Sequence, residues 1–436
     1  MSWLLGLVPL VCLLACVILW WMWSQDTGLF APNPPYKPYS YCSTPDTSLP
    51  DNAGWSAVVP DSSWEGWEPP KFDRIDDSTV QLEAVGFDSK GQIYVAGNFS
   101  QIGGLAASGI ARWDPFSQHW YSLGDGLLSQ DNYISNLTLL VDPQGSVYVS
   151  GTFASAGGKI VNGVALWDGQ NWSDLQGGLM DGRIEAMASD GSGGLFIGGS
   201  FTQVGALHSP GIAHWNGKAW DNLEGIAERL VEQAGVQSTY VSGIAFDPAR
   251  QILYASGSGQ YGDHPFLAEW KNAQPGWSMI TLAKSAQPRQ LLLDSSGGLY
   301  VGGWSRSDLA EGSNGIAHYS EGHWSGLGKG LTRFGTKLSG GIDYDDFFVG
   351  SMALDGKGGL YIGGNFLAVE DKCVYGMAHW NGVEWESLGN SVLVNGRFSW
   401  DMVKSIAYDT DGYLYVVGGF QSAGGKPIRY LARWRP

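Results

Sequence analysis

The chain has 436 residues, of which 42 are acidic and 25 are basic, so its formal net charge is −17. This balance provides no basic surface to neutralise phosphates, and it therefore excludes nucleic acid as an expected partner. Only 15% of the residues are charged, whereas Trp (21) and Gly (64) are unusually abundant. A repeated pattern, described below, accounts for most of these Trp and Gly residues.

An uncharged apolar run of 21 residues extends from Trp3 to Trp23. A helix of that length rises about 1.5 Å per residue and crosses roughly 30 Å of hydrocarbon. Trp20, Trp21 and Trp23 crowd one end, as in an interfacial aromatic belt. We therefore predict a single transmembrane helix over residues 1–25.

Two alternatives to an uncleaved anchor remain open. A secretory signal peptide is disfavoured because the run is long and lacks a basic start and a small-residue cleavage site. A lipoprotein is suggested by Leu13-Leu-Ala-Cys16, although apolar residues follow the cysteine. The acidic remainder of the chain is more easily explained outside the cytoplasm, so we expect it on the periplasmic or extracellular side.

Residues 26–61 form a Pro-rich segment that predicts an extended arm. Cys42 lies in this arm, and Cys373 lies far along the chain. In an oxidising compartment these two residues are candidates for a disulfide, with two free thiols as the alternative.

Seven copies of one pattern occupy most of residues 62–436. Each copy contains a D-x-x-G-like turn, and an aromatic residue follows the Asp by six positions, or seven in the fourth copy. Four short β-rich runs separated by Gly, Asp, Asn and Ser make up each copy, which is typical of four antiparallel strands. The seven turns begin at Asp88, Asp142, Asp190, Asp247, Asp294, Asp355 and Asp409.

Repeats of this length indicate an array or a closed ring. A four-stranded sheet cannot bury both of its faces alone, so the copies must pack face to face around an axis. We predict an all-β, seven-bladed β-propeller of four-stranded blades with an N-terminal single transmembrane helix. One strand position is always Gly, which we expect to let neighbouring sheets approach closely: Gly97, Gly151, Gly199, Gly257, Gly303, Gly364 and Gly418.

The last copy supplies only three strands, because no W-x-x-L run follows Leu431 to Trp434. A propeller of this kind closes with a strand from the other end of the chain. Trp64-Glu-Gly-Trp67 has a suitable form, so we predict that residues 62–68 pair with the C-terminal blade.

The repeat resembles those of Kelch-type propellers, because Gly-Gly pairs in the second strand precede an aromatic residue and then a Trp. The run from Gly151 to Leu175 is similar to repeats of bacterial secreted propellers and of fungal cell-surface proteins that mark cortical polarity. The resemblance covers about residues 62–436 and implies the propeller fold. It implies no reaction, since such folds carry many unrelated activities.

We predict no catalytic residue, metal ligand or cofactor. His214, His318 and His379 share one repeat position, so they are spread around the ring and we interpret them as structural. Metal-binding spacings are absent from the sequence around them. The repeated Asp turns fit Asx turns better than calcium loops.

Departures from the repeat are the candidate interaction sites. One insertion, Gly225 to Gly235, has helical character, and another, Thr332 to Phe348, is acidic and aromatic. The fourth copy is itself irregular. Exposed aromatic loops suit protein or glycan contact, with ordinary variable loops as the alternative. The candidate interaction residues are Tyr344, Asp345, Asp346, Phe347, Phe348, Tyr261 and His264.

The leading functional hypothesis is a non-catalytic, membrane-anchored extracytoplasmic propeller that serves as an accessory or scaffolding subunit of a membrane-protein complex. Its expected partners are other membrane-protein subunits, contacted through the helix, the arm and the propeller face. A cell-surface adhesion or glycan-binding module is the second hypothesis. An enzyme that uses the axial channel is the third.

Overall fold

A computed structural model describes residues 54–59 and 82–435, apart from internal segments at 130–132, 143–144, 223–224, 236–238, 260–263, 272–273, 284–285, 305–308, 310–312, 333–347, 367, 390–391 and 394–402. This part of the chain is all-β except for one α-helix, α2 (Ile226–Ala234). That helix confirms the helical character predicted for the first insertion. It buries Ile226, Ala227 and Leu230.

The predicted single-pass membrane location is corrected by the structure. Over the residues described, no helix combines the length and apolar character needed to cross a membrane. The nine residues of α2 span only about 14 Å. Residues 1–25, with Trp3, Trp20, Trp21 and Trp23, lie outside the described part.

Seven four-stranded antiparallel sheets make up the described fold. The first sheet consists of β2 (Leu82–Phe87), β3 (Ile93–Gly97), β6 (Ile110–Asp114) and β7 (His119–Ser122), and the second of β9 (Thr138–Val141), β10 (Val147–Ser150), β13 (Val164–Trp167) and β14 (Trp172–Ser173). The third sheet consists of β15 (Ile184–Ser189), β16 (Leu195–Gly199), β19 (Ile212–Trp215) and β20 (Trp220–Asp221), and the fourth of β21 (Thr239–Asp247), β22 (Ile252–Gly259), β23 (Phe266–Lys271) and β24 (Gln274–Met279). Each sheet is named below by its first strand.

The remaining three sheets follow the same order, except that the last borrows a strand. They are β25 (Pro288–Leu293), β26 (Leu299–Gly303), β27 (Ile316–Ser320) and β28 (His323–Gly326); β29 (Phe348–Leu354), β30 (Leu360–Asn365), β33 (Met377–Trp380) and β34 (Trp385–Ser387); and β36 (Ser405–Tyr408), β37 (Leu414–Val417), β39 (Leu431–Trp434) and β1 (Trp55–Ala57).

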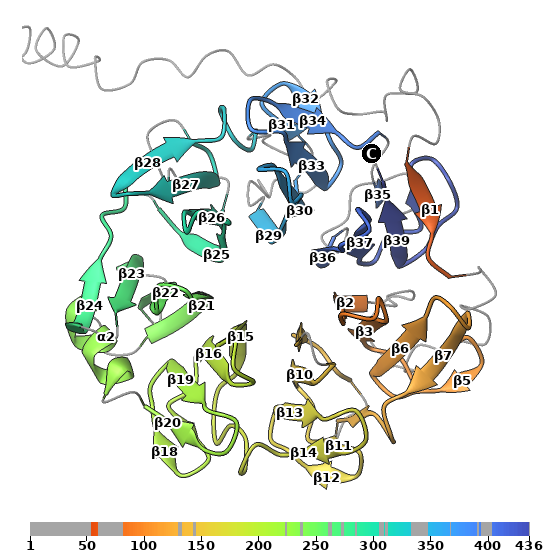
Figure 1. The fold of residues 1–436 in the computed structure, drawn as a ribbon, viewed down its shortest axis with the longest axis horizontal. Coiled ribbons are helices and arrows are strands. Elements are labelled where there is room, and N and C mark those ends of the chain that lie inside the picture. The colour runs from red at the N-terminus through yellow and green to blue at the C-terminus, as the bar shows by residue number, and fades with distance from the viewer. Residues whose placement is uncertain are drawn as a thin grey trace, which may run out of the picture. The chain divides into compact units, whose positions relative to one another are not determined.

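The first strands of the seven sheets contact one another in a closed cycle. In order, β2 contacts β9, and the contacts continue through β15, β21, β25, β29 and β36 back to β2. Figure 1 shows these strands nearest the centre of the cycle, with the fourth strands outside. The sheets therefore pack face to face, as the repeat predicted.

Short two- and three-stranded sheets lie in the connections between the main strands. They are β4 (Gln101–Ile102) with β5 (Leu105–Ala106); β8 (Leu127–Leu128) with β11 (Ser155–Ala156) and β12 (Lys159–Ile160); β17 (Gln203–Val204) with β18 (Leu207–His208); β31 (Ala368–Val369) with β32 (Lys372–Cys373); and β35 (Val392–Leu393) with β38 (Ser422–Ala423).

The closing strand is β1, in antiparallel register with β39 from Trp55 opposite Trp434 to Ala57 opposite Ala432. Its predicted position, residues 62–68, therefore needs correction, and those residues lie outside the described part. Trp55-Ser-Ala-Val58 has the same form as Trp172-Ser-Asp-Leu175, a Trp followed three residues later by an aliphatic side chain. Both N-terminal Trp segments match the pattern, so spacing alone did not separate them.

A recurring indole hydrogen bond joins neighbouring sheets. The Nε1 atom of the fourth-strand Trp donates to a carbonyl that follows the fourth strand of the preceding sheet, as from Trp172 to Leu123 at 2.7 Å. Trp55 continues this series, because its Nε1 donates to the Leu388 carbonyl at 2.7 Å. The other pairs are Trp220 with Leu175, Trp277 with Ile226, Trp324 with Thr281, and Trp385 with Leu327.

The repeated Asp residues form the predicted Asx turns. In Asp355 the Oδ1 atom accepts from the amides of Lys357 and Gly359, each at 2.7 Å. The same pattern occurs at Asp88, Asp190, Asp294 and Asp409. These turns connect the first and second strands.

The repeated Gly has a different role from the one predicted. A Cβ atom on Gly199 would lie 2.0 Å from the Arg183 carbonyl oxygen, and one on Gly257 would lie 2.0 Å from the Tyr240 oxygen. Both oxygens belong to residues beside or within the first strand of the same sheet. The ladder shifts register there in five first strands, β2, β15, β21, β25 and β29. The Gly thus makes room for a β-bulge and does not serve packing between sheets at these positions.

Replacing Gly199 with Ala is therefore expected to lower the free energy of unfolding by roughly 2 kcal/mol, because the bulge backbone cannot move aside. Urea denaturation followed by circular dichroism measures the change. Gly350→Ala is the matched control, since its Cβ would meet nothing closer than 3.4 Å. An equal loss in the two variants would contradict the assigned role.

Candidate functional site

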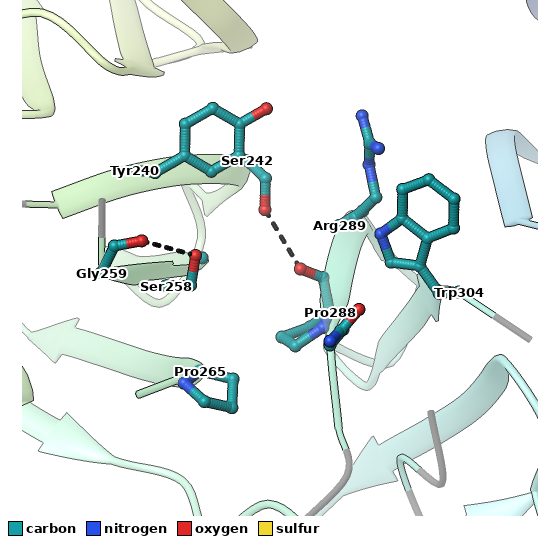
Figure 2. Close-up of a pocket in the computed structure, with 10 residues that line it drawn as sticks. Tyr240, Ser242, Ser258, Gly259, Pro265, Pro288, Arg289 and Trp304 are labelled. Carbon is teal, nitrogen blue, oxygen red and sulfur yellow. Dashed lines mark hydrogen bonds between the residues drawn. The ribbon is translucent and has the colours of Figure 1, made fainter. Parts of the chain in front are cut away.

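A cavity of about 310 Å³ opens between the β21 and β25 sheets (Figure 2). It lies where the first strands begin and the second strands end, and we call this side of the sheets the cavity face. Its lining residues are Tyr240, Ser242, Gly257, Ser258, Gly259, Pro265, Gln287, Pro288, Arg289 and Trp304.

The cavity follows from a missing aromatic side chain. Five sheets place a Phe two residues after the repeated Gly, and each is at most 4% exposed: Phe99, Phe153, Phe201, Phe366 and Phe420. Each packs in the core shared by its own sheet and the preceding one. The β21 sheet has Gly259 at this sequence position and the β25 sheet has Ser305, so two successive junctions lack the Phe.

The two junctions compensate differently. Between the β15 and β21 sheets, Ile226, Ala227 and Leu230 of α2 enter the shared core. Between the β21 and β25 sheets, the core contains Ala286 and Leu309 but no Phe from either sheet. The second junction therefore keeps open space at the cavity face.

Arg289 stands at the β-bulge of β25. Pro288 pairs with Gly303 and Gln290 pairs with Gly302, which leaves Arg289 outside the regular ladder. Its guanidinium carbon lies 5.3 Å from the ring centroid of Trp304 and 5.3 Å from that of Phe348. Bulges often re-aim a side chain next to a functional site.

Hydroxyl groups complete the opposite wall. The Ser242 hydroxyl donates to the Pro288 carbonyl at 3.1 Å, which links the two sheets across the cavity (Figure 2). Burial, and then the nearby Glu185 carboxylate, raise the pKa of Tyr240, while the positive charge of Arg289 opposes this shift. Tyr240 therefore carries a neutral phenol that can donate a hydrogen bond.

The structure describes two of the seven predicted interaction residues, Phe348 and His264. Phe348 begins β29, and its ring packs against Trp304 with centroids 5.0 Å apart. His264 is exposed in the connection beside the cavity residue Pro265. Tyr344, Asp345, Asp346, Phe347 and Tyr261 lie outside the described residues. The sequence signal for Arg289 and Trp304 was the replacement of Gly-x-Phe by Gly303-Trp-Ser.

The repeated histidines lie away from this cavity, beside the Asp turns. His214 Nε2 lies 3.1 Å from Asp190 Oδ2, and its Nδ1 lies 3.2 Å from Asp221 Oδ2. His318 pairs with Asp294 at 2.8 Å and His379 with Asp355 at 3.0 Å. Each pair connects the turn of one sheet to its third strand, and among the described residues no group of three or more potential metal ligands occurs.

The pKa of His214 predicts a pH effect on stability. Burial disfavours the charged form of His214, but hydrogen bonds to Asp221 and Asp190 outweigh it and raise its pKa. Its contribution to the free energy of unfolding is therefore fully present below about pH 6.5 and is lost as the pH rises through the folded-state pKa.

His214→Leu tests this effect, because Leu166 occupies the same repeat position in the β9 sheet. The stability difference between the native chain and the variant is expected to shrink between pH 6 and pH 9, as measured by urea denaturation at a series of pH values. Replacing the exposed His119 with Leu is the control. A difference that grows with pH would be inconsistent with the raised pKa of His214.

Cys373 is disulfide-bonded. Cys42 lies outside the described residues, so its predicted pairing with Cys373 stays a prediction.

No family model matches the chain, and no curated protein matches it. Several solved structures are similar to the chain. The extracellular domain of a putative hybrid two-component system from B. thetaiotaomicron is 12% identical with a TM-score of 0.50, covering 88% of this chain and 40% of that one. The GH74 enzyme of Niastella koreensis is 15% identical with a TM-score of 0.47, covering 80% and 53%, respectively. YCF48 from Cyanidioschyzon merolae is 13% identical with a TM-score of 0.46, covering 88% and 99%.

The fold is of the β-propeller type. The chain spans about two-fifths and about half, respectively, of the length of the first two similar structures. Folds of this type carry many unrelated activities, so the fold leaves the choice between catalysis and binding open.

Proposed function

We propose that this chain is a non-catalytic, seven-bladed propeller with Kelch-like repeats that serves as an accessory or scaffolding subunit of a protein complex. The cavity face is the proposed contact surface. One observation carries this proposal: the cavity that has Arg289 and aromatic side chains at its edge lies at a junction where the repeat itself is broken. The closed cycle of first strands supports the seven-bladed assignment.

The lining suits binding better than catalysis. It supplies hydrogen-bond donors from Arg289 and Tyr240 and an apolar wall from Trp304 and prolines. Activation of a serine requires an adjacent general base, and none of the ten lining residues is a carboxylate, an imidazole or a lysine. Aromatic and Arg side chains are the residue types that dominate binding energy at protein interfaces.

A glycan-binding module is the second candidate. The partly exposed ring of Trp304 at the mouth of a cavity that also carries hydroxyl groups favours it. The two candidates differ in what they retain: a protein partner in one case, and a polysaccharide in the other.

Native co-purification of the tagged full chain, followed by mass spectrometry and a glycan-array screen, tests the proposal. We expect a partner protein at near-equal stoichiometry and its loss in Trp304→Ser. Phe116→Ser is the matched control, because Phe116 is 86% exposed and lies in the hairpin between β6 and β7. A chain that purifies alone and binds a defined glycan would overturn the scaffold assignment.

A further inference from the structure

Arg289 is held in place by stacking and not by an ion pair. The Trp304 and Phe348 rings lie on it at 5.3 Å each, with 54° between the two ring planes. Such contacts orient a guanidinium while leaving its N–H edges available. Among the described residues, no hydrogen-bond acceptor or carboxylate pairs with Arg289.

Some other basic residues of the described chain pair with carboxylates. Arg250 Nη1 donates to Asp247 at 2.8 Å, and Lys271 Nζ lies 2.7 Å from a Glu269 oxygen. The chain has 42 acidic residues against 25 basic ones, so carboxylates are abundant. An Arg that lacks one while lining a cavity presents donors suited to an external acceptor.

The cavity limits what that acceptor can be. Arg289 is the one cationic side chain among the ten lining residues, which suits a singly charged carboxylate, since a guanidinium fork matches its two oxygens. Pro265, Pro288 and Trp304 offer apolar surface beside it. A volume of about 310 Å³ has room for roughly one or two residues, and so for a chain end in preference to a continuous segment.

We infer that this cavity binds the C-terminal carboxylate of a partner polypeptide that ends in an apolar residue, with Arg289 as the residue that recognises the carboxylate. The inference rests on the proposed function, because it names the partner chemistry of the same site. Tyr240 and Ser242 line the opposite side, where the Tyr240 phenol orients the bound chain end. Trp304 contacts its apolar side chain.

The test uses a matched pair of probes, N-acetyl-phenylalanine and its primary amide, titrated into the purified full chain and followed by calorimetry. We expect the acid to bind at least tenfold more tightly than the amide. Arg289→Gln is expected to weaken binding of the acid by ten- to a hundredfold, as for loss of a charged hydrogen bond. Arg289→Lys recovers only part of the affinity, because it keeps the charge but not the fork.

Arg229→Gln is the control, since it removes the same charge from an exposed position on α2. Thermal unfolding confirms that each variant is folded. Equal affinity for acid and amide, no effect of Arg289→Gln, or tighter binding of glucuronate than of the peptide acid would each overturn the inference. Failure of the proposed function gives a different result, namely no co-purifying partner; a partner that stays bound to both the native and Arg289→Gln chains removes only the carboxylate assignment.

Discussion

Replacing Trp55 with Ala is expected to lower the free energy of unfolding by about 3 to 5 kcal/mol. Trp55 is 1% exposed, although its strand contributes only three residues to the last sheet. Its ring packs in one core with Val392 and Phe420, and its Nε1 donates to the Leu388 carbonyl at 2.7 Å. Lys426 Nζ donates to the Trp55 carbonyl at 2.7 Å. Truncation therefore removes core packing and the bond that joins the last sheet to the β29 sheet.

Urea denaturation and limited proteolysis of the full chain measure this effect. Trp64→Ala is the informative control, because residues 62–68 were favoured for the same position by sequence alone. If β1 is the closing strand, Trp64→Ala lowers the free energy of unfolding less than Trp55→Ala does. If Trp64→Ala were the more damaging variant, the assignment of β1 as the closing strand would be wrong.

Asp355→Ala is expected to cost roughly 2 to 4 kcal/mol, because three donors lose one buried acceptor. The carboxylate is 8% exposed and accepts from the Lys357 and Gly359 amides and from His379. Burial alone would raise the pKa of Asp355, but these hydrogen bonds outweigh it and lower the pKa below its usual value. The contribution is present above about pH 4 and is lost as the pH falls through the folded-state pKa.

Asp168 provides the matched comparison. Its Oδ1 accepts from the Gln170 and Asn171 amides in a turn of similar form, but the turn is exposed. Asp168→Ala is therefore expected to cost no more than about 1 kcal/mol in the same urea assay. Similar losses at the two positions would show that burial does not amplify the effect at Asp355.

Local features of the fold were readable from the repeat. The Asp turns need only a side-chain oxygen and amides two and four residues later, so a short stretch of sequence specifies them. The strands and α2 were also predictable from short stretches of sequence. For α2, Gly225 and Gly235 flank a run that lacks the alternation typical of a strand. The interpretation of His214 as structural agrees with its bonds to Asp190 and Asp221.

Strand pairing between distant parts of the chain could not be predicted from the sequence in the same way. Trp55 and Trp64 both offer a suitable Trp pattern, and the choice between them depends on which segment meets β39 across the whole chain. The repeated Gly was assigned to packing between sheets, whereas Gly199 and Gly257 accommodate bulges in their own sheets. A bulge depends on the register of two strands, which residue type alone does not specify.

The amino-acid sequence was thus sufficient to predict the repeat, its four-stranded unit, its turns and the irregularity at Gly259, because each of these features depends on neighbouring residues within one unit. The cavity depended on the tertiary structure. Gly259 and Ser305 each lack the expected Phe, but only packing shows that α2 fills one junction and leaves the other open. Arg289, Trp304 and Phe348 come from two adjacent sheets, and face-to-face packing of those sheets brings them together.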